Sequence, residues 1–361
     1  MRAVLLVSML LHLALGYRGT ALPARAGLLA LRSFSTLLNT PVVIRGIQDV
    51  AESFDCFFFD QFGCIHNGIE PYDNSIAVLQ QLKLLQKRIV IISNSANRRA
   101  SSIERLDRMG FAGLYDDVIT SGEMAYEYLK ANHQHQKALL FGWKDKALVS
   151  DLSEINIKLA LIEDADIVIL AGTQNVYTSE EGEPHMRISE SLYLKGELTQ
   201  EVQKIFQVAM SRGLKVVVAN QDYEAITKAG TVTYMPGLLK DYYADLCGGS
   251  HNIVAFGKPN RDIFQQALSG AAVPLTGSKM SQQRLLGRCI HVGDSLHHDV
   301  SGAAGAGISS LLITRYGVHK DRLHGHGAQG EDVDAQRLLL GVCELSDSLE
   351  LPRPSYVITK W

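Results

Sequence analysis

The sequence has few cysteines, and their spacing is not that of a disulfide framework or a zinc site. Five cysteines are scattered over 361 residues without a CxxC pair, so buried free thiols in a reducing compartment are expected. An excess of basic charge is also missing, because 35 Lys and Arg stand against 38 Asp and Glu and the formal net charge is -3. This balance argues against the basic surface of a nucleic-acid-binding protein, and no nucleic-acid partner is expected.

Long apolar runs are absent from the body of the chain. After residue 38 no stretch is long enough for a membrane helix, and no repeat of fixed period occurs. With 46% hydrophobic and 20% charged residues, the chain can nevertheless bury a substantial core. A globular mature protein without a membrane partner is therefore expected.

Acidic residues are missing from the N-terminal segment, where Asp49 is the first. Arg2 precedes an apolar run over residues 3–15, which is short for a bilayer span, and the following small residues resemble a signal-peptide cleavage site. The next stretch is rich in Arg, Ser and Thr, as in an organellar transit peptide. Residues 1–38 are thus predicted to be a bipartite targeting presequence. Import into a plastid is favoured, with a mitochondrion or secretion as the alternatives.

Apolar runs of strand length alternate with helical patterns in the remaining sequence. One buried strand is expected over residues 54–60, ending at Asp60, and a second over residues 88–92, ending before Ser93. A helical pattern over residues 75–85 separates them. The alternation continues along the chain and predicts an α/β fold with a doubly wound, Rossmann-like sheet. Ligands bind at the carboxyl ends of the strands in such sheets, where Asp60 and Ser93 fall.

A second set of strand and helix patterns predicts an inserted α/β domain. The predicted organisation is a presequence (1–38), a first core part (39–136), the insert (137–232) and a second core part (233–361). Strands over residues 289–292 and 310–313 are expected to resume the first sheet. The stretch 317–334 is rich in His, Gly and charge and is predicted to be a mobile surface loop, with His319, His324 and His326 in solvent.

Four short segments carry residue types that suit phosphoryl transfer. They are Asp60-Gln61-Phe62-Gly63, Ser93-Asn94, Gly257-Lys258-Pro259, and residues 293–299. A phosphate ester repels an attacking carboxylate, so such a site needs a divalent metal, a fixed cation and hydrogen-bond donors. Asp60 is the candidate nucleophile, Lys258 the cation and Ser93 the donor. Asp60 and Asp294 are candidate Mg²⁺ ligands, and Asp299 is a further ligand, either direct or through water.

The order of these segments resembles the four motifs of the haloacid dehalogenase (HAD) superfamily. Five further segments resemble its class IIA, which contains NagD-like and p-nitrophenyl-phosphatase-like proteins. They are His66-Asn67-Gly68, Pro71-Tyr72, Ile92-Ser93-Asn94-Ser95, Ala219-Asn220-Gln221-Asp222 and Met235-Pro236-Gly237. The resemblance covers most of the mature chain. It implies a Rossmann-like core with an inserted, mobile α/β cap domain of type II, Mg²⁺ dependence, and hydrolysis of a small phosphomonoester through an aspartyl-phosphate intermediate.

The resemblance also implies how a substrate is held. The cap usually supplies substrate contacts in this class, so Asn220 and Asp222 are candidate substrate-binding residues, with packing between the domains as the alternative. Asn94 in the core is a third candidate. A small phosphorylated metabolite is the expected partner, and a homodimer through the cap stays open because caps of this kind often take part in dimer contacts.

Phe62 departs from the pattern of the superfamily. Typical phosphatases of this kind have an Asp there as general acid and base, a contribution of about 10²- to 10⁴-fold. Metal binding is expected to survive, because the backbone carbonyl of this residue is the ligand. Three explanations stay open: a good leaving group such as an acyl or aryl phosphate, proton delivery by His66 or His298, or ligand binding without turnover. A class IIA subgroup with an aromatic residue at this position also resembles the chain.

The leading hypothesis is a Mg²⁺-dependent phosphatase whose activity is reduced by Phe62. The alternative is a catalytically weakened HAD-fold protein that binds a phosphorylated ligand or a protein partner. Retention of Asp60, Ser93, Lys258 and Asp294 favours the enzyme, since a scaffold would need none of them. Displacement at a carbon centre is disfavoured by the acidic metal set. The identity of the phosphorylated substrate is not readable from the sequence.

Overall fold

A computed structural model describes residues 40–144, 147–179, 186–187, 191–226, 231–271, 281–325 and 334–361. The predicted presequence and His326 lie outside the described residues. Residues 41–361 group into one compact unit. Among the described helices, none combines the length and apolar character that a membrane span requires.

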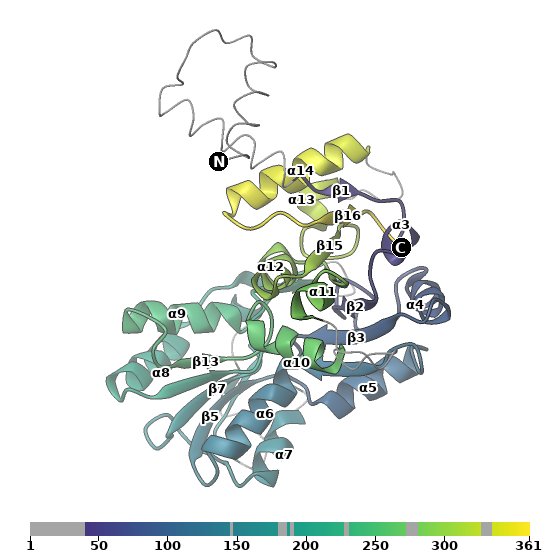
Figure 1. Ribbon diagram of the computed structural model, residues 1–361. Coiled ribbons are helices and arrows are strands. Elements are labelled where there is room, and N and C mark those ends of the chain that lie inside the picture. The colour runs from purple at the N-terminus through teal and green to yellow at the C-terminus, as the bar shows by residue number, and fades with distance from the viewer. Residues whose placement is uncertain are drawn as a thin grey trace, which may run out of the picture. The chain divides into compact units, whose positions relative to one another are not determined.

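The first sheet is parallel throughout, in the order β1-β16-β15-β14-β2-β3-β4 (Figure 1). Its strands are β1 (Val42–Val43), β2 (Cys56–Phe59), β3 (Arg88–Ser93), β4 (Asp117–Thr120), β14 (Cys289–Gly293), β15 (Ser309–Ile313) and β16 (Tyr356–Ile358). β2 and β14 are neighbours at its centre and are buried along their whole length. This is why both strands appear in the sequence as continuous apolar runs.

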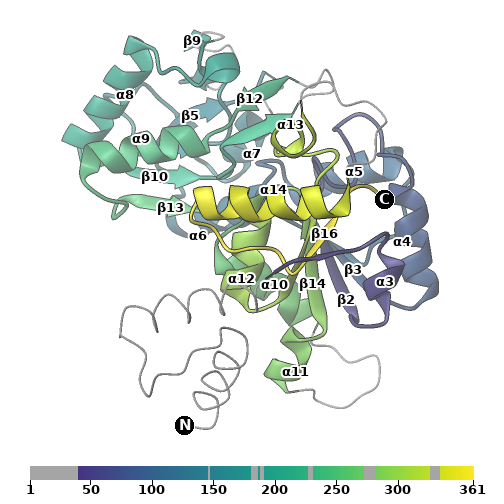
Figure 2. The same ribbon diagram turned by 90° about the horizontal axis from the view of Figure 1, so that it is seen from above.

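Helices cover both faces of the first sheet (Figures 1 and 2). Successive side chains of a strand point to opposite faces, so Phe57 and Phe59 pack against α3 (Gln48–Ala51) and α4 (Ser75–Leu84). Cys56 and Phe58 pack on the other face against α10 (Arg261–Ala271) and α12 (Ser301–Ala306). The further helices near this sheet are α5 (Arg99–Arg108), α11 (Gln282–Leu286), η2 (Leu296–Val300), α13 (Lys320–His324) and α14 (Ala335–Ser348).

A second, mixed sheet has the order β13-β10-β7-β5-β8-β9, with β6 paired to β5. Its strands are β5 (Lys137–Gly142), β6 (Lys158–Leu159), β7 (Ile167–Leu170), β8 (Asn175–Tyr177), β9 (Met186–Arg187), β10 (Lys215–Val218) and β13 (Ile253–Ala255). The helices near it are α6 (Ser121–Asn132), α7 (Ala147–Glu154), η1 (Ser191–Lys195), α8 (Gln200–Ser211) and α9 (Gly237–Cys247). A separate hairpin joins β11 (Glu224–Ile226) and β12 (Val232–Tyr234).

The second sheet continues past residue 232. β13 pairs with β10 in parallel, and Leu239 and Tyr243 of α9 are buried in the same apolar cluster as Phe206 of α8. Hydrophobic periodicity gives no indication that α9 and β13 pack with α8 and β10. The doubly wound α/β fold predicted from the sequence is confirmed.

The predicted mobile loop over residues 317–334 is wrong for its first part. Residues 320–324 form α13, and Leu323 packs against Leu338 and Val342 of α14. His319 and His324, which were expected in solvent, are both buried. His324 Nε2 lies 3.0 Å from the Thr314 hydroxyl. The sequence did not predict this helix, because its composition is polar and its packing against α14 depends on one buried leucine, Leu323.

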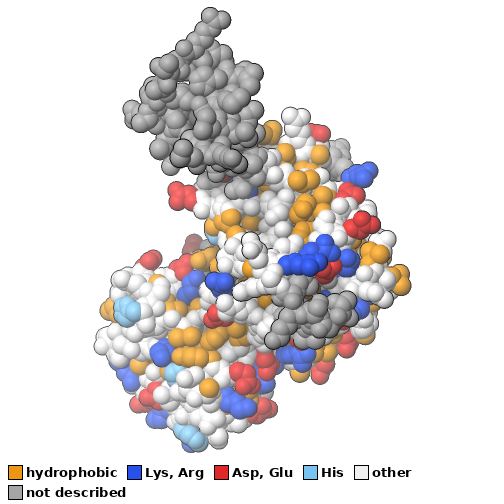
Figure 3. Space-filling model, in the orientation of Figure 1, with side chains coloured by type: hydrophobic (Ala, Val, Ile, Leu, Met, Phe, Trp, Pro, Cys, Tyr) orange, Lys and Arg blue, Asp and Glu red, His pale blue; other side chains and the backbone are white. Residues whose placement is uncertain are grey.

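On the face shown in Figure 3, acidic and basic side chains are interspersed with hydrophobic ones over the described residues. This mixture agrees with the small net charge of the sequence.

Candidate active site

Two acidic residues lie where neighbouring strands end. β2 and β14 run in parallel, with Phe59 paired to Val292. Asp60 follows β2 and donates its backbone N–H to the Val292 carbonyl at 2.9 Å. Asp294 follows β14 directly. Parallel strands bring their carboxyl ends to one edge of the sheet, so these distant residues become neighbours.

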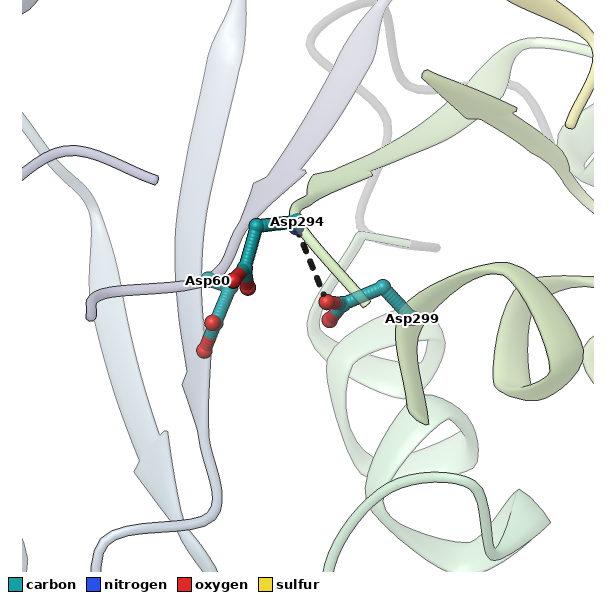
Figure 4. A group of neighbouring side chains, drawn as sticks. All are labelled: Asp60, Asp294 and Asp299. Atoms are coloured by element: carbon teal, nitrogen blue, oxygen red, sulfur yellow. Dashed lines mark hydrogen bonds between the residues drawn. The ribbon is translucent and has the colours of Figure 1, made fainter. Parts of the chain in front are cut away.

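A third carboxylate completes an acidic cluster (Figure 4). Asp299 lies in η2, and its carboxylate faces the end of β14. Oxygen atoms of Asp60, Asp294 and Asp299 all lie within 4.8 Å of one another, and all three residues are buried. The structure thus brings together the three carboxylates that the sequence predicts as metal ligands.

Two glycines allow the chain to approach Asp294 closely. A Cβ atom on Gly317 or on Gly63 would overlap Oδ2 of Asp294. Gly63 also has a φ of +73°, in the left-handed region that favours glycine. Any side chain at either position would displace the Asp294 carboxylate.

Lys258 supplies the positive charge of the cluster. Its Nζ atom lies 2.5 Å from Oδ1 of Asp60 and 2.8 Å from Oδ1 of Asp299, and the side chain is only 2% exposed. Burial opposes the charged ammonium group, but the Asp299 and Asp60 carboxylates raise the pKa of Lys258 above its ordinary value. The predicted cation therefore bridges the predicted nucleophile and the third carboxylate.

The three carboxyl groups differ in their proton affinity. Burial raises the pKa of Asp60 to about 7, an effect that Asp299 reinforces and Lys258 opposes. Burial and the charges of Asp299 and Asp60 raise the pKa of Asp294 well above its usual range. For Asp299, burial acts in the same direction, but Lys258 and His291 lower the pKa below the ordinary value. When all three carboxyl groups are ionised, their negative charge exceeds the single positive charge of Lys258.

Asp299 is held on both oxygens by the protein. Oδ1 contacts Lys258 Nζ and also lies 2.7 Å from Nε2 of His291. Oδ2 accepts the backbone N–H groups of Asp294 and Ser295 at 3.1 and 2.9 Å. A carboxylate has about four acceptor positions, and these four contacts use them. The geometry favours a role for Asp299 in holding Lys258, with any metal contact made through water.

The residues present fit a hard divalent cation. Asp60 and Asp294 offer carboxylate oxygens, and Phe62, whose backbone carbonyl is the predicted third ligand, lines the same cavity. One lysine does not balance three buried carboxylates, and a divalent cation would offset the remaining charge. Mg²⁺ binds oxygen ligands and typically uses one or two carboxylates, which matches this set.

Ser93 is the last residue of the neighbouring strand β3, and Asn94 follows it. Both are buried and line the cavity, and the Ser93 hydroxyl accepts the Ser95 N–H at 3.1 Å. Both polar atoms of the Asn94 side-chain amide form hydrogen bonds with the backbone of Lys258. Oδ1 accepts the Lys258 N–H at 2.6 Å, and Nδ2 donates to the Lys258 carbonyl at 2.8 Å. Asn94, predicted to bind substrate, is thus placed to position Lys258.

The two predicted cap residues lie at the end of β10 and face the core. Asn220 accepts the Asp222 N–H on its own side-chain oxygen at 2.8 Å, which closes a local turn. Asp222 accepts a hydrogen bond from Asn94 Nδ2 at 2.8 Å, and lies 3.7 Å from Nε2 of His298. Both residues line the cavity, and the Asn94–Asp222 hydrogen bond shows that this segment packs against the core. Substrate contact by Asn220 and Asp222 stays a prediction.

The two histidines proposed as proton donors have different surroundings. Nδ1 of His66 accepts the Gly68 N–H at 3.0 Å, and burial lowers its pKa to about 3. Among the described residues, His298 lines the cavity and His66 does not. Nδ1 of His298 faces the Lys258 carbonyl at 3.3 Å, so this nitrogen carries hydrogen. Burial also lowers the pKa of His298.

Phe62 occupies the mouth of the acidic cluster. The residue is 37% exposed, and its ring packs edge-on against His66, with ring centroids 4.8 Å apart. The Arg105 guanidinium lies 5.4 Å from the ring centroid. The ring has no group that can exchange a proton with a leaving oxygen.

The cavity has a volume of about 720 Å³ and is lined by residues from both sheets. Sequence analysis missed Arg105 of α5 and the aromatic residues Trp143, Tyr193 and Tyr223, which also line it. Trp143 follows β5 and Tyr223 precedes β11, so each lies just outside a strand. A position beside a strand end was the one available signal for these two residues, and it does not distinguish a cavity wall from a surface loop. Arg105 and Tyr193 lie within α5 and η1 and had no such signal.

A strand-tip carboxylate, two more buried carboxylates, a fixed lysine and a second sheet that closes the cavity define a class of doubly wound α/β hydrolase. A family model for haloacid dehalogenase-like hydrolases matches residues 57–158, and a HAD-hydrolase-like model matches residues 255–337. The first match holds Asp60 and Ser93, and the second holds Lys258 and Asp294. The chain therefore belongs to the haloacid dehalogenase-like hydrolases.

Individual proteins show the same relationship. The D-glycerol 3-phosphate phosphatase of Mycobacterium tuberculosis is 21% identical over 271 residues, or 74% of this chain. This match spans only 65% of the length of that phosphatase. A second curated relative, from Saccharomyces cerevisiae, is matched over only 20% of its length.

Solved structures extend the comparison to the fold. A haloacid dehalogenase-like hydrolase from Brucella suis has a TM-score of 0.64 at 22% identity, covering 88% of this chain and 98% of that one. A 4-nitrophenylphosphatase from Thermotoga maritima has a TM-score of 0.55 at 20% identity, covering 86% and 96%.

Proposed function

We propose that this protein is a phosphatase that hydrolyses a small phosphomonoester, with Asp60 as nucleophile and Mg²⁺ as cofactor. One observation carries the proposal: Lys258 Nζ lies 2.5 Å from the strand-tip carboxylate of Asp60, within a buried cluster that also holds Asp294 and Asp299. Phosphoryl transfer depends on positioning and on offsetting the negative charge of the phosphate. Membership of a hydrolase family supports this proposal.

In this proposal an Asp60 oxygen attacks phosphorus, and the bond from phosphorus to the leaving oxygen breaks with its electron pair going to that oxygen. Lys258 offsets the charge of the phosphoryl group, and the Ser93 hydroxyl donates to a phosphate oxygen. Water then hydrolyses the aspartyl phosphate and restores Asp60. Asp60, Asp294 and the Phe62 carbonyl would hold a Mg²⁺ ion, which would supply electrostatic stabilisation of the phosphoryl charge.

Phe62 weakens one part of this reaction. General acid catalysis contributes about 10²- to 10⁴-fold, and the ring provides none. His66 is removed from consideration as a substitute, because it does not line the cavity and its Nδ1 accepts a backbone N–H. We therefore expect slow hydrolysis of simple alkyl esters and faster hydrolysis of esters whose leaving group needs no proton.

Asp60→Asn tests the nucleophile. The substitution keeps the shape of the side chain but removes its anionic oxygen, so Mg²⁺-dependent phosphate release from an activated phosphate ester should fall by at least about 10³-fold. The matched control is Asp164→Asn, an exposed carboxylate outside the cavity, which should leave the rate unchanged. Equal rates in wild type and Asp60→Asn would overturn the mechanism.

The alternative, a ligand-binding protein without turnover, predicts a different result in the same assay. Wild type would then release no phosphate from any member of a phosphometabolite panel, while one member would bind saturably. Calorimetry on the panel in the presence of Mg²⁺ distinguishes the two hypotheses.

A further inference from the structure

The cavity has two chemically different ends. Asp60, Asp294 and Lys258 form the charged end, at the carboxyl edge of the first sheet. The other lining residues include a group contributed by the second sheet and its hairpin that is mainly apolar or aromatic. Its apolar and aromatic members are Trp143, Tyr193, Tyr223, Ala225, Ile226, Met235 and Leu238, and its polar members are Asn220, Asp222, Glu224 and Thr233. A substrate with its phosphoryl group at the charged end therefore presents its leaving group to this wall.

The aromatic side chains of this wall are held in place by the protein. The Trp143 carbonyl accepts the Tyr177 hydroxyl at 2.5 Å. Its indole packs directly on Gly172, where a Cβ atom would lie 2.7 Å from Cδ2. Tyr193 meets Trp143 edge-on, with ring centroids 6.2 Å apart. A fixed pair of rings binds a ligand without the cost of ordering them first.

Tyr223 extends the wall toward the charged end. Its ring lies 5.5 Å from that of His298, at an interplanar angle of 31°, and 5.6 Å from that of His297. The Lys240 ammonium group lies 5.3 Å from the centroid of the Tyr223 ring. Tyr223 and the two histidines thus form a second group of flat side chains in the cavity lining.

The chemistry at residue 62 restricts the leaving group independently of this wall. Phe62 supplies no acid, and Nδ1 of His298, the nitrogen that carries hydrogen, faces the Lys258 carbonyl at 3.3 Å, so the leaving oxygen departs as an anion. A phenol has a pKa of about 10, whereas the pKa of water, near that of an aliphatic alcohol, is about 15.7. A phenoxide is therefore a far better leaving group than an alkoxide when no proton is supplied.

We propose that Trp143, Tyr193 and Tyr223 form a subsite for a flat aromatic leaving group, and that the substrate is an aryl phosphate. This inference rests on the proposed phosphatase function. The Asp60 oxygen bonds to phosphorus, the bond between phosphorus and the aryl oxygen breaks, and the phenoxide leaves with the electron pair. The phenoxide then takes a proton from water, and a second water hydrolyses the aspartyl phosphate.

Three kinds of substrate separate the subsite from the leaving-group effect. Substituted phenyl phosphates have both a ring and a good leaving group, acetyl phosphate has a good leaving group without a ring, and glycerol phosphate has neither. In wild type with Mg²⁺, kcat/KM for phenyl phosphates should exceed that for glycerol phosphate by at least about 100-fold, the lower end of what general acid catalysis contributes. It should also rise as the pKa of the phenol falls.

Substitution of the wall tests the ring contacts. Trp143→Leu and Tyr193→Leu should each lower the ratio of kcat/KM for phenyl phosphate to that for acetyl phosphate by about tenfold, since a lost aromatic contact and its buried area amount to about 1.4 kcal/mol. Trp143→Phe keeps a ring and should restore most of the ratio. Leu194→Ala, at an exposed neighbour of Tyr193 outside the cavity, is the control and should leave the ratio at the wild-type value.

The outcomes distinguish this inference from the proposal beneath it. Absence of turnover on all three substrate kinds would overturn the phosphatase function itself. Turnover of glycerol phosphate at a rate similar to phenyl phosphate would overturn the aryl preference and leave the phosphatase intact. An unchanged ratio in folded Trp143→Leu and Tyr193→Leu would remove the subsite.

Discussion

Asp294 has surroundings that make it dependent on a bound cation. The backbone of Gly63 and of Gly317 approaches its carboxylate closely. Carboxylate oxygens of Asp60 and Asp299 lie within 4.8 Å of it. Its Oδ2 accepts the backbone N–H of Val318 at 2.8 Å. Burial and the neighbouring charges raise its pKa well above the usual range. A carboxyl group in this position is stabilised by a proton or by a metal ion.

Magnesium should therefore stabilise the folded protein, and Asp294→Asn should remove most of this effect. Binding at 100 times the Kd contributes about 2.7 kcal/mol, which thermal unfolding with and without Mg²⁺ measures as a shift in Tm. The shift should grow as the pH rises above about 6, because Asp60, with a pKa of about 7, and Asp294, whose pKa is also raised, lose their protons before they bind metal.

Two comparisons make this prediction specific. Asp222→Asn, which changes a cavity carboxylate outside the acidic cluster, should keep the Mg²⁺ shift. Without metal, Asp294→Asn should be at least as stable as wild type, because the substitution relieves repulsion among three carboxylates. A full Mg²⁺ shift in Asp294→Asn would show that the ion binds elsewhere.

At the scale of elements, η2 depends on the short helix α13. His319 precedes α13 and is buried, and its Nε2 accepts the backbone N–H of Leu296 at 3.1 Å. This contact fixes the first residue of η2, the element that presents His298 and Asp299. Only a neutral imidazole can accept that hydrogen bond, and burial lowers the pKa of His319 to about 4.

The stability of the protein should therefore fall with acidification through His319. The folded-state pKa lies below the unfolded value of about 6.5, so the unfolded chain takes up a proton that the folded chain does not. The contribution to stability is present above about pH 6.5 and is lost as the pH falls toward about 4. By about pH 5 the loss amounts to about 2 kcal/mol.

His319→Gln tests this contribution, because its amide oxygen can accept the same hydrogen bond without titrating. The decrease in unfolding free energy between about pH 7 and about pH 5, measured by denaturant titration, should be about 2 kcal/mol smaller than in wild type. His251→Gln, at an exposed histidine, controls for the loss of an imidazole and should follow wild type. Parallel pH profiles for wild type and His319→Gln would disprove the assignment.

At the scale of the whole molecule, residues 219–222 after β10 lie against residues that follow β3 and β4 of the first sheet. The Ser121 hydroxyl donates to the Ala219 carbonyl at 2.6 Å, and Gln221 Nε2 donates to the Gly257 carbonyl at 3.0 Å. Asn94 Nδ2 donates to Asp222 Oδ1 at 2.8 Å. Because Asn94 also clamps the backbone of Lys258, the position of the second sheet is coupled to the position of the proposed catalytic cation.

Breaking this connection should loosen the junction without unfolding either sheet. In Gln221→Ala combined with Asp222→Ala, backbone hydrogen exchange over residues 219–222 and 256–258 should increase by at least about tenfold. The central strands β2 and β7 serve as internal controls and should keep their protection, since their hydrogen bonds lie within the sheets. Uniform loss of protection would instead indicate global destabilisation.

Much of the fold was predictable because buried parallel strands need long apolar runs. The runs ending at Asp60 and Ser93, and the run before Asp294, predicted β2, β3 and β14. Strand order then places those three ends together, so the cluster with Lys258 was expected from residue type and spacing. Elements that depend on one or two anchoring residues, such as α13 with Leu323, had no comparable signal.

The sequence by itself therefore determined the α/β architecture and the set of charged residues at the strand ends, because burial on both faces imposes an apolar pattern that can be read locally. Only the tertiary structure decided what their neighbours do. Asn94, a candidate substrate ligand, also holds the backbone of Lys258, a residue 164 positions away, and Trp143 is part of a cavity wall. Such roles depend on contacts between distant segments, and hydrophobic periodicity carries no information about which segments meet.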